Sequence, residues 1–354
     1  MIYHMAAYLQ VYISILNLIH YVSFRSIASL LSTLGLSIFL GIRFIERSKI
    51  SFRSAPRMHT PESHQAKGQM PTMGGLFIIL GVVINTLFWC NLSDAKVWLF
   101  LLLIIAFGLI GLCDDLSKIG RKRGLSARFK FCLQTLTAFI ISALAVKFGS
   151  IEPIIALPLL KNVTIMIGFG FVLWATLIIV GCSNAVNLTD GLDGLAIGAI
   201  IPNFATFGFI SYLAGHKQLA AYLYIPYAHS EEMVVISAIL VGASLGFLWF
   251  NAYPAQIFMG DVGSLALGAS LAYIALVSKQ ELLLPIAGGL FVLETISVIL
   301  QVCSIKLLSK RIFRMAPIHH HFELIGWPES RITIRFCIIS LVLCLIALMT
   351  LKIR

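Results

Sequence analysis

The chain has 354 residues, of which 59% are hydrophobic and 12% are charged, and its formal net charge is +11. The core of a soluble protein cannot bury that much apolar surface, so the composition excludes an ordinary soluble domain and indicates an integral membrane protein. The seven cysteines are scattered through apolar stretches without a CxxC pair, which is typical of small core residues.

The first twenty residues have neither a basic start nor a small-residue cleavage site, so we expect an interfacial helix there and no removable signal peptide. A membrane-spanning helix needs about 20 apolar residues. Apolar runs of that kind predict ten spans, at 24–46, 72–92, 97–113, 129–148, 163–183, 191–213, 233–250, 257–277, 282–307 and 333–351. We therefore expect an all-α integral membrane protein with a single polytopic membrane domain over residues 1–354.

Basic residues gather in the three longest polar connections. Five Lys or Arg residues lie in 47–71, five in 114–128 and four in 308–332. Each of these connections joins an odd-numbered span to the next even-numbered one, so all three lie on one side of the membrane. Because basic loops stay in the cytoplasm, we expect this side to be cytoplasmic, together with the short loops 184–190 and 251–256, and both termini to be periplasmic.

Between the fifth and sixth spans, residues 182–196 read CSNAVNLTDGLDGLA, with a polar residue at every third position from Asn184 to Asp193. In one continuous helix, each step of three residues would lag a full turn by about 60°. Asn184 and Asp193 would then face opposite ways. We therefore expect a helix to end near Asn184, a turn through Asn187, and a new helix to start near Asp190.

Five of the fifteen acidic residues fall at the expected cytoplasmic ends of spans: Asp114, Asp115, Asp190, Asp193 and Asp261. One acid at such a position is usually just solvated or caps a helix, but five on one face favour a site. Adjacent carboxylates repel each other, so Asp114 and Asp115 need a cation. Lys118, Lys122, Lys130 or Mg²⁺ could supply it, and the absence of nearby Cys or His in ligand spacing disfavours zinc.

Three further segments lie on the same side, around Lys67, around Asn251 and Phe258, and around the run His319, His320 and His321. Taken alone, three loop histidines are more often solvated than functional. The chain has no Walker loop and no GxGxxG after a strand, so any handling of phosphate must rest on Mg²⁺, lysine and histidine. Inside the ninth span, Glu294 and Gln301 predict a cavity or a partner helix.

The motifs PTMGG, GLCDDLSK, NAVNLTDGLDGLA, FLWFN, FMGDVGSLALG, ETISVILQ and PIHHHFE occur in that order over nearly the whole chain. In these motifs the chain resembles the phospho-N-acetylmuramoyl-pentapeptide transferase family. The aspartate motifs alone are shared by the wider superfamily of polyprenyl-phosphate sugar-1-phosphate transferases. PTMGG and PIHHHFE are the segments that narrow the resemblance.

The resemblance implies an enzyme of the bacterial cytoplasmic (inner) membrane that works in peptidoglycan synthesis with its active site on the cytoplasmic face. It transfers phospho-MurNAc-pentapeptide from UDP-MurNAc-pentapeptide to undecaprenyl phosphate, and the products are lipid I and UMP. The implied cofactor is Mg²⁺, and the partners are the two substrates and membrane lipid, with no nucleic acid. A homodimer stays open, because the sequence does not fix the oligomeric state.

The resemblance also assigns residues to roles. Asp261 is the implied metal ligand, and Asp114 and Asp115 either assist the metal or position and deprotonate the lipid phosphate. Lys130 and His319 complete the implied catalytic set. The implied substrate-binding residues are Lys67, Thr72, Lys122, Asn187, Asp190, Asp193, Asn251, Phe258, Gln301, His320 and His321, with Phe258 stacking on uracil.

Two other functions fit parts of this pattern. A related enzyme of the superfamily would transfer another sugar phosphate, such as GlcNAc-1-phosphate, although the HHH segment argues against it. A cation-coupled transporter would also carry intramembrane acids, but these belong at mid-membrane on broken helices, whereas all five aspartates are expected at span ends.

Overall fold

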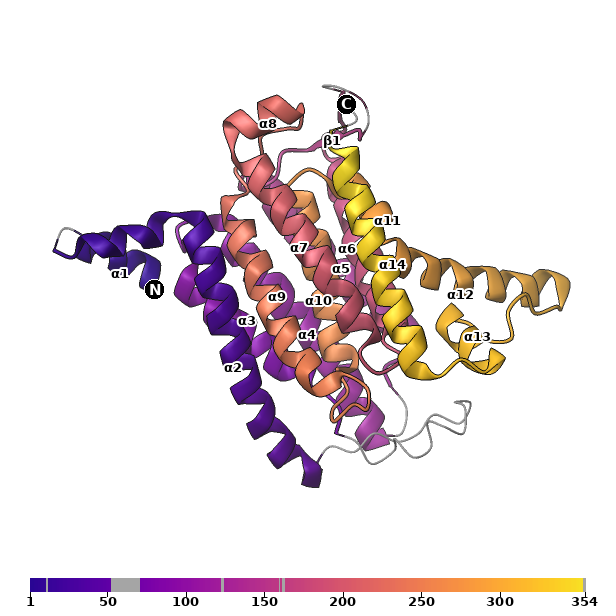
Figure 1. The fold of residues 1–354 in the computed structure, drawn as a ribbon. Coiled ribbons are helices and arrows are strands. Elements are labelled where there is room, and N and C mark those ends of the chain that lie inside the picture. Colours follow the sequence, from indigo (N-terminus) through magenta and orange to yellow (C-terminus); the bar gives the residue numbers. More distant parts are fainter. Residues whose placement is uncertain (11, 52–70, 122–123, 159, 161–162, 353–354) are drawn as a thin grey trace.

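The computed structural model describes residues 1–10, 12–51, 71–121, 124–158, 160 and 163–352. The chain is almost entirely helical (Figure 1). In chain order the elements are α1 Ile2–Leu9, η1 Ser14–His20, α2 Val22–Ser51, α3 Gly75–Trp89, α4 Ala95–Arg121, α5 Ala127–Lys147, β1 Ile154–Ala156, β2 Thr164–Met166, α6 Gly170–Thr189, α7 Leu195–Gly215, α8 Lys217–Leu223, α9 Glu231–Asn251, α10 Gly260–Val277, η3 Glu281–Leu283, α11 Leu284–Ala287, α12 Gly289–Leu308, α13 Ile318–Ile325 and α14 Glu329–Thr350.

The prediction of an all-α integral membrane protein is confirmed. Among the described residues, nine helices are long and apolar enough to cross a membrane, namely α2, α4, α5, α6, α7, α9, α10, α12 and α14. The remaining expected span, 72–92, contains the shorter apolar helix α3, which has 15 residues. Residues 71–74 are not helical because they hydrogen-bond to another segment of the chain, as described below for the site.

Helix α10 lies at the centre of the bundle and is buried along its whole length. It packs against α3, α4, α6 and α7. Two glycines bring its first turn close to neighbouring helices, because a Cβ on Gly111 of α4 or on Gly75 of α3 would overlap the backbone of α10. Asp261, at the start of α10, is therefore held directly against α4.

The prediction that a helix ends near Asn184 is wrong, because the turn lies further along the chain. Helix α6 continues through Asn184 and Asn187 to Thr189, and α7 begins only at Leu195. The two asparagines are tolerated inside the helix because their amides find partners: Asn184 donates to Gln134 Oε1 at 2.7 Å, and Asn187 to Ser264 Oγ at 2.7 Å. Asp190 thus follows α6 as its C-terminal cap and does not start the next helix.

The expected loops also differ from the structure, because helices extend into them or form within them. Helix α4 extends to Arg121, so Asp114 and Asp115 lie inside it, about two turns before its end. The negatively polarised C-terminal end of α4 is therefore too far away to act directly on these two carboxylates. Within 308–332 the structure places the short helix α13, and α2 extends to Ser51, while 52–70 lie outside the described residues.

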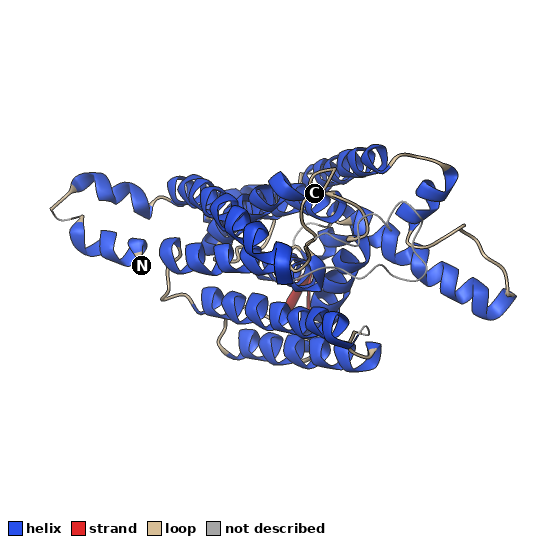
Figure 2. Ribbon diagram, turned by 90° about the horizontal axis from the view of Figure 1, so that it is seen from below, coloured by secondary structure: helices blue, strands red, loops and turns tan. Residues whose placement is uncertain are grey.

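The fifth expected span also starts later than predicted, because 154–156 and 164–166 form a small antiparallel hairpin in which Ile154 pairs with Met166. The expected N-terminal helix is present as α1. Seen from below, α1 and η1 extend from one side of the bundle, and α12 and α13 from the other (Figure 2). The basic ends of α2 and α4 share the lower end of the bundle in Figure 1. That this end is cytoplasmic stays a prediction.

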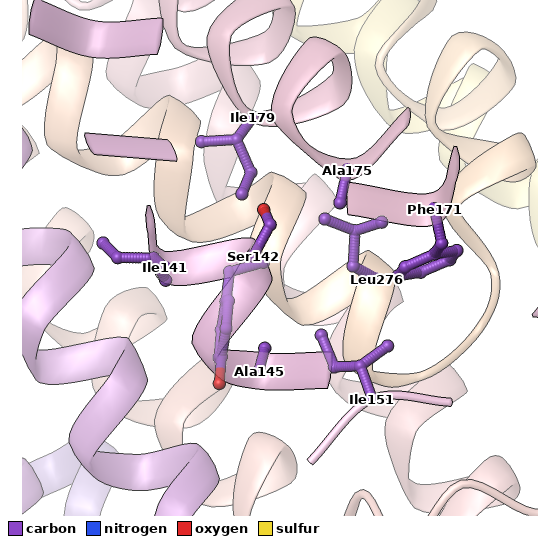
Figure 3. Close-up of a pocket in the computed structure, with 9 residues that line it drawn as sticks. Ile141, Ser142, Ala145, Ile151, Phe171, Ala175, Ile179 and Leu276 are labelled. Carbon is purple, nitrogen blue, oxygen red and sulfur yellow. The ribbon is translucent and has the colours of Figure 1, made fainter. Parts of the chain in front are cut away.

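The pocket drawn in Figure 3 belongs to the packing of the bundle. It lies between α5, α6 and the last turns of α10 and is lined by apolar side chains such as Ile141, Phe171 and Leu276, with the Ser142 hydroxyl among them. Leu276 is separated from Asp261 by fifteen residues of α10, which correspond to about 22 Å along a helix. This pocket is therefore remote from the acidic residues.

Candidate active site

Three of the five singled-out aspartates meet at one point. Asp114 and Asp115 of α4 and Asp261 of α10 are 3%, 5% and 8% exposed. One carboxylate oxygen from each lies within 4.8 Å of the others. Buried carboxylates at this spacing repel one another and need compensating positive charge.

Two lysines supply part of that charge. The Lys118 ammonium lies 2.8 Å from Asp114 Oδ2, 3.1 Å from Asp115 Oδ1 and 2.9 Å from Asp261 Oδ1. Lys130 of α5 lies 3.3 Å from Asp114 Oδ2 and pairs closely with Asp261 Oδ2. Three carboxylates and two ammonium groups leave one excess negative charge when all five are ionised.

The backbone around this acidic cluster (Asp114, Asp115, Asp261, Lys118 and Lys130) is shaped to fit it. The Leu125 amide donates to Asp114 Oδ1 at 2.7 Å, and the Val262 amide donates to Asp115 Oδ2 at 3.3 Å. Gly260 has φ +73, and a Cβ there would overlap the Asp115 carboxylate, so both conformation and space require glycine. Asp261 lies in the first turn of α10, where the helix dipole favours negative charge.

The donor set of the cluster fits a hard divalent cation. Its three acidic members offer only carboxylate oxygens, and Mg²⁺ favours a few carboxylates together with water and phosphate oxygens. No Cys or His belongs to this group of described residues, whereas zinc usually has such ligands. These residues could therefore hold a divalent metal beside a bound phosphate.

Residues 97–279, more than half of the chain, match the family described as Glycosyl transferase family 4. The chain belongs to this family. As a family 4 transferase, it is a membrane enzyme of the polyprenyl-phosphate sugar-1-phosphate transferase superfamily, with a nucleotide-sugar donor and a polyprenyl phosphate acceptor. The matched residues include the whole acidic cluster and the turn between α6 and α7, but not the helix α13 that contains the three histidines.

Beside the cluster, two predicted motifs pair through their backbones. The amide of Phe258 donates to the Pro71 carbonyl at 3.0 Å, and the amide of Gly74 donates to the Phe258 carbonyl at 2.9 Å. The PTMGG segment, with Thr72, thus lies along the segment leading to Asp261, although almost 190 residues separate them. The Phe258 side chain is half-buried at this position.

The turn of residues 190–194 between α6 and α7 is held by hydrogen bonds to other loops. Asp193 is buried and accepts from the Ala255 amide at 3.0 Å, and its own amide donates to Glu329 Oε1 at 2.8 Å. Asn251 accepts from the Gly194 amide at 3.1 Å and donates to the Ile257 carbonyl at 2.8 Å. Both side chains therefore hold the loops around the site together, and direct contact of either with substrate stays a prediction.

The histidine run lies in the first half of α13, a helix where a loop was expected. His319 is fully buried, with Nδ1 3.1 Å from Glu294 Oε2, and His320 Nδ1 lies 2.6 Å from Glu323 Oε2. His321 Nδ1 accepts from the Arg314 amide at 3.1 Å. Gln301 accepts from the Ile312 and Phe313 amides and so shapes the segment before α13.

Two predicted substrate-binding residues, Lys67 and Lys122, lie outside the described residues. Conversely, the structure adds two residues that the expected site did not include. The sequence indicates Lys118 only as one possible counter-ion, although its spacing of three and four residues after the aspartate pair places it on their face of a helix. Nothing in the sequence indicated that Glu329 would reach the turn at Asp193.

Proposed function

We propose that this family 4 transferase transfers phospho-MurNAc-pentapeptide from UDP-MurNAc-pentapeptide to undecaprenyl phosphate in the bacterial cytoplasmic membrane, and releases UMP. The acidic cluster is the observation that carries the proposal. Three carboxylates converge there with two lysines at one end of the central helix. This is suitable for a reaction that brings two phosphate anions together.

Asp261 would hold the Mg²⁺, and Asp115 would assist it. The bound cation would shield the negative charge of the two substrates and stabilise charge that develops during transfer. In the reaction, an oxygen of the polyprenyl phosphate forms a bond to the sugar-proximal phosphorus, and the bond from that phosphorus to the oxygen of UMP breaks. One pyrophosphate replaces another, so the reaction is nearly balanced.

The protein's own residues supply positioning and charge. Lys118 is 34% exposed, so its ammonium group can reach a phosphate oxygen at the open side of the cluster. Lys130 is more buried and pairs with Asp114 and Asp261, which keeps those carboxylates oriented. Asp114 would accept a proton that remains on the lipid phosphate, and the cluster would hold the two substrates in line.

An apolar groove supports a lipid acceptor. It lies between α6 and α12, has a volume of about 320 Å³, and is lined by residues such as Leu177, Ala185, Phe291 and Ile296. Ala185 is one turn before the end of α6, the helix end that leads to the turn beside the site. A prenyl chain could lie in this groove with its phosphate directed toward the acidic cluster.

The experiment is a transfer assay with two competing donors. Purified protein is incubated with undecaprenyl phosphate, Mg²⁺ and either UDP-MurNAc-pentapeptide or UDP-GlcNAc, and released UMP is measured. We expect UMP and a lipid-linked product with the first donor, and loss of both after chelation of Mg²⁺. Preference for UDP-GlcNAc would replace the proposed donor, and no UMP with either donor would contradict the proposal.

A further inference from the structure

Glu294 of α12 and His319 of α13 form a buried pair that is not part of the acidic cluster. Both residues are fully buried, and Glu294 Oε2 lies 3.1 Å from His319 Nδ1. A carboxyl group within an apolar span is costly unless it has a partner. Both residues lie outside residues 97–279, the part of the chain that matches the family.

The opposite edge of the His319 ring faces the turn between α6 and α7. A Cβ on Gly191 would overlap His319 Nε2 and would lie 2.9 Å from Cε1. Gly191 is not among the glycines with positive φ, so its backbone does not require glycine. Glycine is required there because His319 occupies the space that a Cβ would take. His319 is therefore enclosed between Glu294 on one side and the turn on the other.

We propose that Glu294 is a positioning residue that holds His319 against Gly191 and thereby sets the distance between α13 and the turn of residues 190–194. This inference rests on the proposed function and on the substrate-binding roles that the resemblance implies for residues of these two segments, which would then form two walls of the donor pocket. One wall carries His320 and His321, and the other carries Asp190. The C-terminal part of the chain, outside the family match, would then help to decide which sugar donor fits.

The pair adds a fixed point to the other contacts of α13, which include the ring contact of Phe322 with Phe336 of α14 and the hydrogen bond from the Arg314 side chain to the Leu324 carbonyl. A helix of eight residues is not stable by itself in water. A buried hydrogen bond is worth more than an exposed one and specifies one arrangement. Without Glu294, the His319 side chain would lose its only hydrogen-bond partner among the described residues, and the ring would no longer be held in one orientation against Gly191.

Three variants test the proposal from both sides of His319. Glu294→Gln keeps one hydrogen bond to Nδ1 whichever proton arrangement is present, because an amide both donates and accepts. Glu294→Met has similar length but cannot form that bond. Gly191→Ala pushes His319 from the other side. Gly35→Ala on α2 is the matched control, since a Cβ there meets nothing within 4 Å.

The readouts are kcat and KM for the donor, KM for undecaprenyl phosphate, the melting temperature, and calorimetric binding of UDP-MurNAc-pentapeptide. We expect Glu294→Met and Gly191→Ala each to lower donor kcat/KM by about tenfold, as for other residues that orient a histidine, with acceptor KM unchanged. Glu294→Gln should stay within about threefold of wild type. The double variant Glu294→Met/Gly191→Ala should lose about tenfold rather than a hundredfold, because both changes act through His319.

Several results would overturn the positioning role. These are a Gln variant as impaired as the Met variant, multiplicative losses in the double variant, or a lower melting temperature with unchanged kinetics per folded molecule. Running UDP-GlcNAc in parallel separates this proposal from the proposed function. If wild type used only UDP-GlcNAc, the proposed donor would fail, and the same three criteria would decide the role of Glu294 on that donor.

Discussion

Two groups of buried charges lie at opposite ends of the helix bundle, and they differ in balance. At one end, Arg25 of α2 forms two hydrogen bonds to Glu232 of α9, at 3.0 and 2.8 Å. Glu232 also accepts from the Asn91 amide at 2.9 Å, and Arg25 donates to the Trp89 carbonyl at 3.3 Å. One positive charge meets one negative charge, and Arg25 is only 3% exposed.

The acidic cluster at the other end combines three carboxylates with two lysines, one of which is partly exposed. A balanced, enclosed pair ties two helices together and has nothing left to bind. An unbalanced cluster with an open side can attract a further cation and, with it, an anionic substrate. The comparison indicates that charge balance and access, more than burial, separate a structural ion pair from a candidate site in this membrane protein.

The largest effect is expected at Asp261, which is shared by both lysines. Asp261→Asn should abolish turnover, a loss of at least about a thousandfold, because it removes a proposed metal ligand and a charge at the reacting phosphates. The fold should survive, since asparagine has nearly the same shape. The measurement is UMP release over a Mg²⁺ titration with a melting curve in detergent. Near-normal turnover at saturating Mg²⁺ would show that this carboxylate is dispensable.

The Arg25–Glu232 pair should respond in the opposite way, with a large loss of stability and little change in turnover. Glu232→Gln leaves Arg25 buried without its counter-charge, so we expect a loss of about 3–5 kcal/mol in the free energy of unfolding. Turnover per folded molecule should stay within about twofold, as for a change remote from the chemistry. The measurement combines melting curves with UMP release normalised to folded protein.

Replacing both partners sharpens the same test. In Arg25→Met/Glu232→Leu no buried charge is left unpaired, so most of the lost stability should return. A double variant as unstable as Glu232→Gln alone, or one that loses turnover per folded molecule, would show that this pair is more than a structural tie.

The helices themselves could largely be predicted from the sequence, because apolar runs of sufficient length have few alternatives in a membrane. The helix ends were harder to predict where polar residues continue inside the bundle. Asn187 reads as a turn residue but donates to Ser264 on α10, and Asp114 reads as a helix end although α4 continues beyond it. In both cases a partner from a distant segment satisfies the polar group.

The candidate site was predictable as a set of residue types on one face, but its pairings were not. The meeting of Asp261 with Asp114 requires α10 to touch α4 at Gly111, a contact between residues 150 positions apart. The pairing of PTMGG with the segment around Phe258, and of Glu294 with His319, depends on the same kind of tertiary packing. Local patterns carry no information on such contacts.

Asp114 and Asp115 should show stability and turnover moving in different directions. Replacing either with asparagine relieves repulsion among the three carboxylates, so the variant should melt no lower than wild type. Turnover should fall by about a hundredfold, or about 2.7 kcal/mol in the activation barrier. A melting curve and a UMP-release assay on each variant test this. Full activity in both variants would show that Asp114 and Asp115, like Arg25 and Glu232, have a structural role only.

The smallest effect is expected next to the cluster, at Phe258. Its backbone is paired with the PTMGG segment, so the side chain is held at a fixed place near Asp261. If the ring stacks on uracil, Phe258→Ala should weaken binding of the UDP-sugar by about 1–3 kcal/mol, the range of base–aromatic stacking, and leave acceptor affinity unchanged. Phe258→Tyr preserves the aromatic face and serves as the control. Calorimetry with UDP-MurNAc-pentapeptide and with UDP alone measures the effect, and equal losses are expected for both ligands because they share the base. Unchanged affinity for UDP in Phe258→Ala would mean that this ring only packs at the edge of the site, and that the part of the pocket which binds the nucleotide lies elsewhere around the acidic cluster.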